Sequence, residues 1–452
     1  MAIKVQQLDN STSLGTIRLI RLLVKLLVLS LALPELRLGT SGFFYPKPTL
    51  LGQAATGAPF FTEVLVIVIV MLFLLAFMIQ FIRIEPRWYH GVTLILIAAA
   101  FIGLAVPEIS VIPGSGSSFG YARTTFETLG LFFALVSIPW RRKDFIDITR
   151  LFIFVGVVHG TLIFISFLLP YETVPDFFNI VQSNPLRYSG IFVQASRGAA
   201  LLAVSLAILL QQVLSISSIS ITAFVRAGVL SSIILIGILL AQTRASYIAV
   251  AGVVLMFLVE NRKKRLSTVL LLVSGVAVLT LILSTFGVLE IGLSRFGESG
   301  SASESGELLD EIEGSRGFIW EVAFQAMIDY PFGMGYGTLD WYAEDLVLPH
   351  AHNMYLQTGI QSGVASMILI IYLHLRALLW SKRLLTNGAD PELDTAVNGM
   401  RLGLVAFIIA GQFEPFLVTN TAHWFWILLA ILVAPIEPSQ PETHTLKPVP
   451  VS

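Results

Sequence analysis

Two histidines and an asparagine stand where a polar, acidic segment gives way to a long apolar run. The stretch LPHAHNMYLQTGIQSG, residues 348–363, contains His350, His352 and Asn353. An imidazole can take a proton from a hydroxyl group near neutral pH. An asparagine at a helix start can also serve only as a cap, and a histidine there can do the same by hydrogen bonding. His352 is therefore a candidate base, His350 and Asn353 are candidate substrate contacts, and capping is the alternative for His352 and Asn353.

Two arginines stand at the edges of other apolar runs. Arg197 lies in FVQASRGAALLAVSLAILL, and Arg244 lies in LLAQTRASYIAVAGVV between two such runs. An arginine at the edge of the hydrocarbon is costly, and one interpretation is that each side chain reaches to lipid headgroups. A guanidinium also binds phosphate oxygens through paired hydrogen bonds. Together with His352, the two arginines predict a site that holds a diphosphate beside a base.

The composition is that of an integral membrane protein. Of the 452 residues, 55% are hydrophobic and 13% are charged, whereas soluble proteins carry about 25% charged residues. The formal net charge of −1 gives no basic field that would favour nucleic acid as a partner. The absence of cysteine excludes disulfides, thiolate metal sites and a cysteine nucleophile. No carboxylate pair accompanies His352 in the sequence, so we expect neither a metal nor another cofactor.

The apolar runs predict an all-α integral membrane protein with about twelve spanning helices, because a helix needs roughly 20 apolar residues to cross a bilayer. The expected spans are residues 14–33, 61–82, 91–107, 124–140, 149–169, 198–214, 221–241, 245–260, 266–288, 354–379, 399–417 and 421–437. The first is expected to be an uncleaved anchor. Basic loops such as WRRKDF and NRKKR follow even-numbered spans. The positive-inside rule therefore places these loops and both termini in the cytoplasm.

These spans divide the chain into four parts. Residues 1–288 contain the first nine spans, and residues 289–353 form a large external loop with short helices. Residues 354–437 contain the last three spans, and residues 438–452 form a cytoplasmic tail. A loop of this length is expected to be functional or disordered.

The large loop has two parts of different character. Its segment ESGSASESGE, residues 298–307, has the composition of a disordered linker. The segment GFIWEVAFQAMIDY, residues 317–330, predicts a helix with one apolar face that packs on the bundle. That face consists of Phe318, Ile319, Val322, Ala323, Ala326 and Met327. The glycines of PFGMGYG, which follow, lack the lysine of a phosphate-binding loop and predict a tight turn.

Residues 314–372 resemble the O-antigen ligase and polymerase superfamily of bacterial polysaccharide assembly. The segment GSRGFIWEVAFQAMIDYPFGMGYGTLDWYAEDLVLPHAHNMYLQTGIQSG is similar to the family's arginine–tryptophan segment, its Pro–X–Gly–X–Gly turn and its His-Asn-X-X-Leu signature. The matching positions are Arg316, Trp320, Gly333, Gly335, His352, Asn353 and Leu356.

Two further segments extend the resemblance, and the sequence departs from it at Gln361 and at VAS, residues 364–366, where the family commonly has a Gly-rich helix start. QTRASYIA resembles the family's arginine motif and carries the essential arginine onto Arg244. ASRGAALL resembles, less specifically, an earlier arginine site at Arg197. Gln361 stands where family members commonly have glutamate. Because glutamine has no carboxylate, this departure puts in doubt any role of that position in orienting the histidine. The expected roles of the arginines and of His352 are unaffected.

The resemblance implies a metal-independent, inverting glycosyltransferase at the periplasmic face of the inner membrane. Its donor would be a glycan linked to undecaprenyl diphosphate, whose tail stays in lipid while the sugar stays in water. Arg197 and Arg244 would bind the diphosphate, and His352 would act as base or position the acceptor. The expected additional substrate contacts are Arg316, Asn353, His350 and Arg187.

Several acceptors are compatible with this site. Lipid A core would make the protein a ligase, another glycan chain a polymerase, and a protein hydroxyl group an oligosaccharyltransferase. The similarity around PHAHNMYL favours the ligase, whereas the acidity of the large loop argues mildly against an anionic acceptor docking there. A transporter of lipid-linked glycan is the alternative from another class. It predicts charges near the middle of the membrane and internal repeats, whereas the notable charges of this sequence cluster at one face and no repeat is evident.

Overall fold

The computed structural model describes residues 10–30, 61–79, 82, 84, 86–105, 117–169, 179–181, 187–190, 195–215, 221–260, 316–335, 350–418 and 422–437. The predicted ninth span at 266–288, the acidic linker at 298–307 and the tail at 438–452 lie outside the described residues. The predicted boundary between the ninth span and the large loop therefore stays a prediction.

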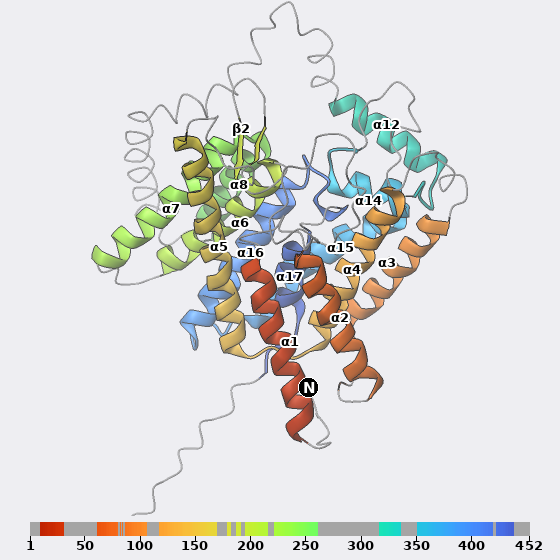
Figure 1. Ribbon diagram of the computed structural model, residues 1–452, viewed down its shortest axis with the longest axis horizontal. Coiled ribbons are helices and arrows are strands. Elements are labelled where there is room, and N and C mark those ends of the chain that lie inside the picture. The colour runs from red at the N-terminus through yellow and green to blue at the C-terminus, as the bar shows by residue number, and fades with distance from the viewer. Residues whose placement is uncertain are drawn as a thin grey trace, which may run out of the picture.

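The described chain is mainly a bundle of α-helices (Figure 1). Its helices are α1 (Asn10–Ser30), α2 (Phe61–Met78), α3 (Trp88–Ala105), α4 (Ser117–Ser137), α5 (Arg142–Leu168), α6 (Ala195–Ser215), α7 (Ile221–Ala241), α8 (Arg244–Glu260), α12 (Arg316–Asp329), α14 (Met354–Ser362), α15 (Val364–Trp380), α16 (Pro391–Ala410) and α17 (His423–Val433), with short 3-10 helices η5 (Ser381–Leu384) and η6 (Phe416–Val418). Helices α1 to α8 overlap the first eight predicted spans, and α15 to α17 overlap the last three. The predicted helical class is confirmed for this bundle.

Among the described residues, four helices are long and apolar enough to cross a membrane. They are Arg142–Leu168, Ala195–Val213, Val364–Leu384 and Pro391–Ala410. Shorter apolar helices of 10–17 residues are Val64–Met78, Trp88–Gly103, Val225–Ala241, Arg244–Val259 and His423–Val433. The protein is therefore a membrane protein, as predicted. The number of twelve spans stays a prediction, because only four described helices meet both criteria.

Small residues allow α6 and α16 to pack closely along their length. A Cβ atom at Gly399 would lie 3.4 Å from Ile208, and one at Gly403 would lie 3.0 Å from Val204. Successive contacts thus move forward along α16 and backward along α6, so the two helices are antiparallel. Small residues at such an interface let the backbones of membrane helices approach closely. The same register places Arg197, in the first turn of α6, at the level of the last turn of α16.

The bundle has two ends with different contents. At the basic end, α5 begins next to Arg141 and Arg142, and α15 runs into η5 with Lys382 and Arg383. At the loop end, uppermost in Figure 1, α5 and α7 finish while α6 and α8 begin. The predicted site residues therefore lie at the opposite end of the bundle from Arg141, Arg142, Lys382 and Arg383.

A short β-hairpin lies at the loop end and departs from the all-α prediction. β1 (Asn179–Val181) pairs antiparallel with β2 (Arg187–Gly190). β2 contacts α5, α6 and α7, and the ring of Tyr188 packs edge-on against Phe167 at 5.5 Å between centroids. The predicted external loop between the fifth and sixth spans is thus partly a hairpin that sits on three helix ends.

The predicted tenth span at 354–379 is wrong as one continuous helix. α14 ends at Ser362 and α15 begins at Val364, with Gly363 between them at φ 88° and ψ 162°. This backbone conformation is essentially restricted to glycine, so the residue type explains the break. His352 consequently precedes a short helix of 9 residues rather than a helix that crosses the membrane.

The predicted amphipathic helix of the large loop is α12, and it packs on α14. Ile319, Ala323, Ala326 and Met327 are buried in a cluster with apolar residues of α14. Phe318, by contrast, is 52% exposed. The predicted apolar face is therefore correct except at Phe318, which points away from the interface.

Ion pairs connect the helices of the basic end. Lys25 on α1 places its Nζ 2.8 Å from Asp144 Oδ1 and 2.7 Å from Asp147 Oδ2, both on α5. Arg21 Nε donates to the carbonyl oxygen of Pro139 at 3.1 Å, and its guanidinium pairs with Glu437 after α17. Buried charges need such partners, and these contacts hold α1 and the end of α17 against the start of α5.

Candidate active site

Asn353 starts α14 and connects it to the end of α16. Its Oδ1 accepts hydrogen bonds from the backbone amides of Tyr355 and Leu356, at 2.9 and 3.1 Å. Its Nδ2 donates to the backbone oxygen and to Oε1 of Gln412, at 3.2 and 3.3 Å. Asn353 is therefore an N-cap whose oxygen and nitrogen are both engaged. This is the capping alternative that the sequence left open.

His352 precedes this cap in a conformation that few residues adopt. Its φ is 46°, in the left-handed region, which is strained for a residue with a Cβ atom. Hydrogen bonds on both sides hold the backbone: Asn353 is fixed as described, and the amide of Ala351 donates to Oε1 of the buried Gln357 at 2.8 Å. The imidazole of His352 is half-buried. A fixed backbone with a partly exposed imidazole suits a positioned acid or base.

His350 lies within electrostatic range of both His352 and Arg197. Burial, with further contributions from His352 and Arg197, lowers the pKa of His350 to about 4. His350 is therefore neutral near pH 7. The structure thus brings together three of the predicted site residues, one from the start of α6 and two from the segment before α14.

Arg244 is the first residue of α8, and its side chain is exposed. The preceding turn contains Gln242 at φ 49°. Ala241, at the end of α7, packs in one cluster with Ala195 at the start of α6. The turn therefore places Arg244 at the loop end, next to the helix that carries Arg197.

The other two predicted arginines also begin elements of the loop end. Arg187 is the first residue of β2, and Arg316 is the first residue of α12. The structure describes their backbone, and their side chains lie outside the described part. Their substrate contacts stay predictions, whereas their elements lie beside α6 and α14, respectively.

The glycine-rich turn after α12 is bonded to both sides of the break between α14 and α15. The amide of Met334 donates to the carbonyl of Ile360 at 2.6 Å, and the amide of Val364 donates to that of Pro331 at 3.0 Å. Gly333 has φ 96°, which suits glycine alone. The tight-turn prediction is confirmed, and the turn fixes the end of α14 by backbone hydrogen bonds.

Within the described residues, no group of three His, Cys, Asp or Glu side chains could hold a metal ion. The predicted site residues that the loop end brings together carry guanidinium, imidazole and amide groups. These can bind phosphate oxygens and exchange a proton with a hydroxyl group. The prediction of a metal-free site stays a prediction.

Comparison with known families identifies the central part of the chain. Residues 228–371 match the O-antigen ligase family. The match runs from α7 into α15 and includes Arg244, Arg316, His350 and His352. It confirms the predicted relation to the O-antigen ligase and polymerase superfamily. No curated protein matches the chain.

Two of the predicted arginines, Arg187 and Arg197, lie outside the matched O-antigen ligase segment. For Arg197, the connection to the site is that it lies within electrostatic range of His350. For Arg187, it is the position of β2 against α6. The candidate site therefore combines residues from inside and outside the family match.

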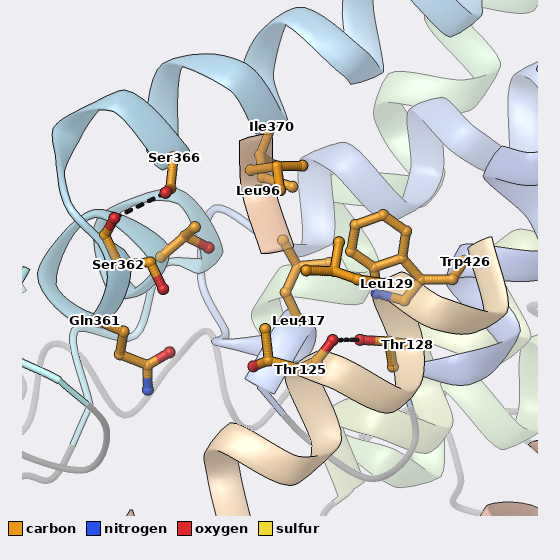
Figure 2. Close-up of a pocket in the computed structure, with 11 residues that line it drawn as sticks. Leu96, Thr125, Thr128, Leu129, Gln361, Ser362, Ser366, Ile370, Leu417 and Trp426 are labelled. Atoms are coloured by element: carbon orange, nitrogen blue, oxygen red, sulfur yellow. Dashed lines mark hydrogen bonds between the residues drawn. The ribbon is translucent and has the colours of Figure 1, made fainter. Parts of the chain in front are cut away.

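Gln361, where the family commonly has glutamate, lies at the far end of α14 from His352. It stands eight residues after Asn353, or about 12 Å along a helix. Its side chain borders a cavity of about 30 Å³ between α3, α4, α14, α15 and α17, large enough for roughly one or two water molecules. Figure 2 shows Gln361 and Ser362 on one side of this cavity and Thr125 and Trp426 on the other. A residue at this distance does not orient His352, so the departure leaves that histidine's surroundings intact.

Sequence reasoning missed an ionic group near this cavity. Glu127 on α4 has its Oε1 3.4 Å from Arg123 Nε, and its Oε2 3.9 Å from Nε2 of the buried His423 at the start of α17. A glutamate inside a predicted span is itself a signal for a paired or functional group. That signal was available at Glu127, while its histidine partner could not be foreseen from so distant a segment.

Proposed function

We propose that this chain is a membrane glycosyltransferase that moves a glycan from an undecaprenyl-diphosphate carrier to lipid A core, and is thus an O-antigen ligase. One observation carries the proposal: Arg197, from the start of α6, and His352, from the segment before α14, both lie within electrostatic range of His350. The match of residues 228–371 to the O-antigen ligase family supports the general class. The identity of the carrier, the identity of the acceptor and the details of the reaction are parts of the proposal that go beyond this match.

The arginines bind the diphosphate of the donor. Arg197 and Arg244 donate charge-assisted hydrogen bonds to phosphate oxygens. These bonds strengthen as negative charge develops on the departing diphosphate, and so they lower the barrier. Arg187 and Arg316, which begin β2 and α12, supply further contacts to phosphate or glycan.

His352 serves the acceptor side of the reaction. It takes the proton of the acceptor hydroxyl group while the oxygen of that group attacks the anomeric carbon. The bond from this carbon to the diphosphate oxygen breaks, and its electron pair leaves with undecaprenyl diphosphate. Attack from the face opposite the leaving group inverts the configuration, and no metal or cofactor takes part.

The neighbours of His352 act in different ways. His350, with a pKa lowered to about 4, stays neutral and hydrogen bonds to the glycan. Asn353 has both polar side-chain atoms engaged by the backbone of α14 and by Gln412. It therefore positions His352 through the backbone rather than contacting substrate.

In this proposal the loop end faces the periplasm and the basic end faces the cytoplasm. The basic residues at the start of α5 and the end of α15 support this orientation through the positive-inside rule. The polyprenyl tail stays in lipid and the sugar stays in water. The bond that breaks must then lie at the boundary, which is where α6 and α8 begin in this orientation.

The identity of the acceptor separates a ligase from a polymerase. Purified protein is given lipid-linked repeat units alone, and then with lipid A core. Transfer that occurs only with lipid A core supports the ligase. A ladder of longer lipid-linked glycans without lipid A core contradicts it and indicates a polymerase.

A matched pair of arginine variants tests the diphosphate contact in the same assay. Arg244→Lys keeps the charge and loses the paired hydrogen bonds, so we expect transfer to fall by about 10²–10³. Arg18→Lys changes an exposed arginine of α1 and should leave transfer unchanged. Near-normal transfer by Arg244→Lys would instead support a role in contacting lipid headgroups.

A further inference from the structure

Two apolar grooves meet on the outer surface of α5. The first, of about 660 Å³, lies between α5, α6 and α7. The second, of about 450 Å³, lies between α1 and α5. Both are lined by Arg150 and Phe154. Their apolar walls include Val157 and Leu230 in the first groove and Leu26, Leu29 and Leu151 in the second.

The charged residues beside these grooves give the groove openings a net positive charge. Arg226 borders the first groove with an exposed side chain, and it forms no ion pair within the described part of the chain. Arg150 Nη2 lies 2.6 Å from Glu392 Oε1, with the Arg150 side chain 62% exposed. Asp147, at the second groove, is paired with Lys25 at 2.7 Å. Each of these two carboxylates is thus paired with a cation, and Arg226 adds a further positive charge.

The position of Arg150 along α5 matches the edge of a bilayer. α5 has 27 residues and is about 40 Å long, roughly 10 Å longer than the hydrocarbon core of a membrane. Arg150 stands eight residues after the start of α5, or about 12 Å along it. Its long side chain can therefore reach the headgroup layer at the basic end, while Phe154 and Val157 lie deeper.

We infer that the two grooves bind one anionic phospholipid, with its phosphate at Arg150 and Arg226 and one acyl chain in each groove. Phe154, which is 51% exposed, stands between the chains. A lipid with two tails fills both grooves, whereas a single polyprenyl chain fills only one. The bound lipid contacts α1, α5, α6 and α7 together. The site lies at the basic end, opposite the candidate active site, and does not depend on the proposed function.

Native mass spectrometry of the detergent-solubilised full chain tests this inference. The protein is titrated with phosphatidylglycerol and, separately, with phosphatidylcholine of the same acyl chains. We expect tighter retention of phosphatidylglycerol. Arg226→Gln should weaken that retention about fivefold and leave phosphatidylcholine unchanged, and Arg226→Lys should largely restore it. Arg18→Gln, at an exposed arginine outside the grooves, should have no effect.

A second pair of variants tests the groove itself. Ala227→Trp fills the first groove, which Ala227 lines, and should weaken retention of both lipids. Val229→Trp, at a residue 55% exposed and outside the groove lining, should not. Equal retention of the two lipids, or equal effects of Arg226→Gln and Arg18→Gln, would overturn the inference. Displacement of phosphatidylglycerol by equimolar undecaprenyl phosphate would show that the occupant has a single chain.

Discussion

The side-chain nitrogen of Asn353 donates to both the backbone and the side-chain oxygen of Gln412, at 3.2 and 3.3 Å. Because Asn353 also caps α14, this contact sets where His352 stands relative to the end of α16. Since α16 packs antiparallel on α6, it also sets the position of His352 relative to Arg197. A short polar connection thus helps to set the spacing between the proposed base, His352, and Arg197, which is proposed to bind phosphate.

Variants at Asn353 separate its two contacts. Asn353→Ala removes the cap and the bond to Gln412, so we expect the free energy of unfolding to fall by about 1–2 kcal/mol. Asn353→Asp keeps the capping oxygen and loses the donor to Gln412, so stability should fall less. Both should lower kcat, because His352 shifts. A folded Asn353→Asp protein with normal kcat would contradict the positioning role.

The glycine between α14 and α15 should be sensitive to substitution for two reasons. At Gly363 an added Cβ atom would lie 2.7 Å from the carbonyl oxygen of Pro331 and would also meet Phe332. Gly388 has a similar φ of 91° but open space around its Cβ position. Gly388→Ala should therefore cost only the backbone strain, of about 1–2 kcal/mol, while Gly363→Ala should cost clearly more.

Thermal unfolding in detergent measures this difference between the two alanine variants. A larger loss for Gly363→Ala supports the clash of a side chain with the turn after α12. Equal losses of stability would show that the turn after α12 moves at little energetic cost and does not fix the end of α14.

The pKa of His350 predicts how stability depends on pH. It lies at about 4 in the folded protein and near 6.5 in an unfolded chain. The unfolded state therefore binds more protons between these values, so this contribution to stability is complete above about pH 6.5 and is lost as the pH falls toward 4. The melting temperature of the wild type should fall more steeply across this range than that of His350→Asn. Parallel curves would mean that the pKa of His350 is not lowered in the folded protein.

Much of the helix pattern could be predicted from the sequence, because hydrophobic runs report burial in lipid or core directly. The predicted span 221–241 has the same ends as α7, because its apolar run is long enough to be recognised despite Arg226, Ser231 and Ser232 within it. The break at Gly363 was not predicted, because a single glycine inside an apolar run is compatible with a continuous helix. Only the contacts with Pro331 and Phe332, on a distant segment, show why the chain turns there.

The candidate site shows the same division. His352 and Arg244 could be singled out, because a polar residue at a hydrocarbon edge is costly and needs a reason. The role of Asn353 could not be decided in advance, since capping and substrate binding favour the same residue type, and its partner Gln412 lies on a distant segment. The pair of Glu127 and His423 depends on the packing of α4 against α17, which no local pattern reveals.

Removal of metal ions tests the chemistry assigned to the arginines. If Arg197 and Arg244 stabilise the departing diphosphate, EDTA should leave transfer from purified lipid-linked donor within about twofold of its untreated rate. Dialysed protein with and without added Mg²⁺ provides the comparison. Inhibition by EDTA that Mg²⁺ or Mn²⁺ reverses would show that a cation carries this role.

The transfer rate of Arg197 and His352 variants tests the central claim most directly. Purified wild type, Arg197→Lys, His352→Ala and the double variant are assayed with lipid-linked glycan and lipid A core, with Arg18→Lys as the control. We predict that each single variant lowers kcat/KM by about 10²–10³. The double variant should lose little more than the worse single one, because the two residues act in one step. Unchanged transfer by either single variant, with the wild type active, would contradict the account.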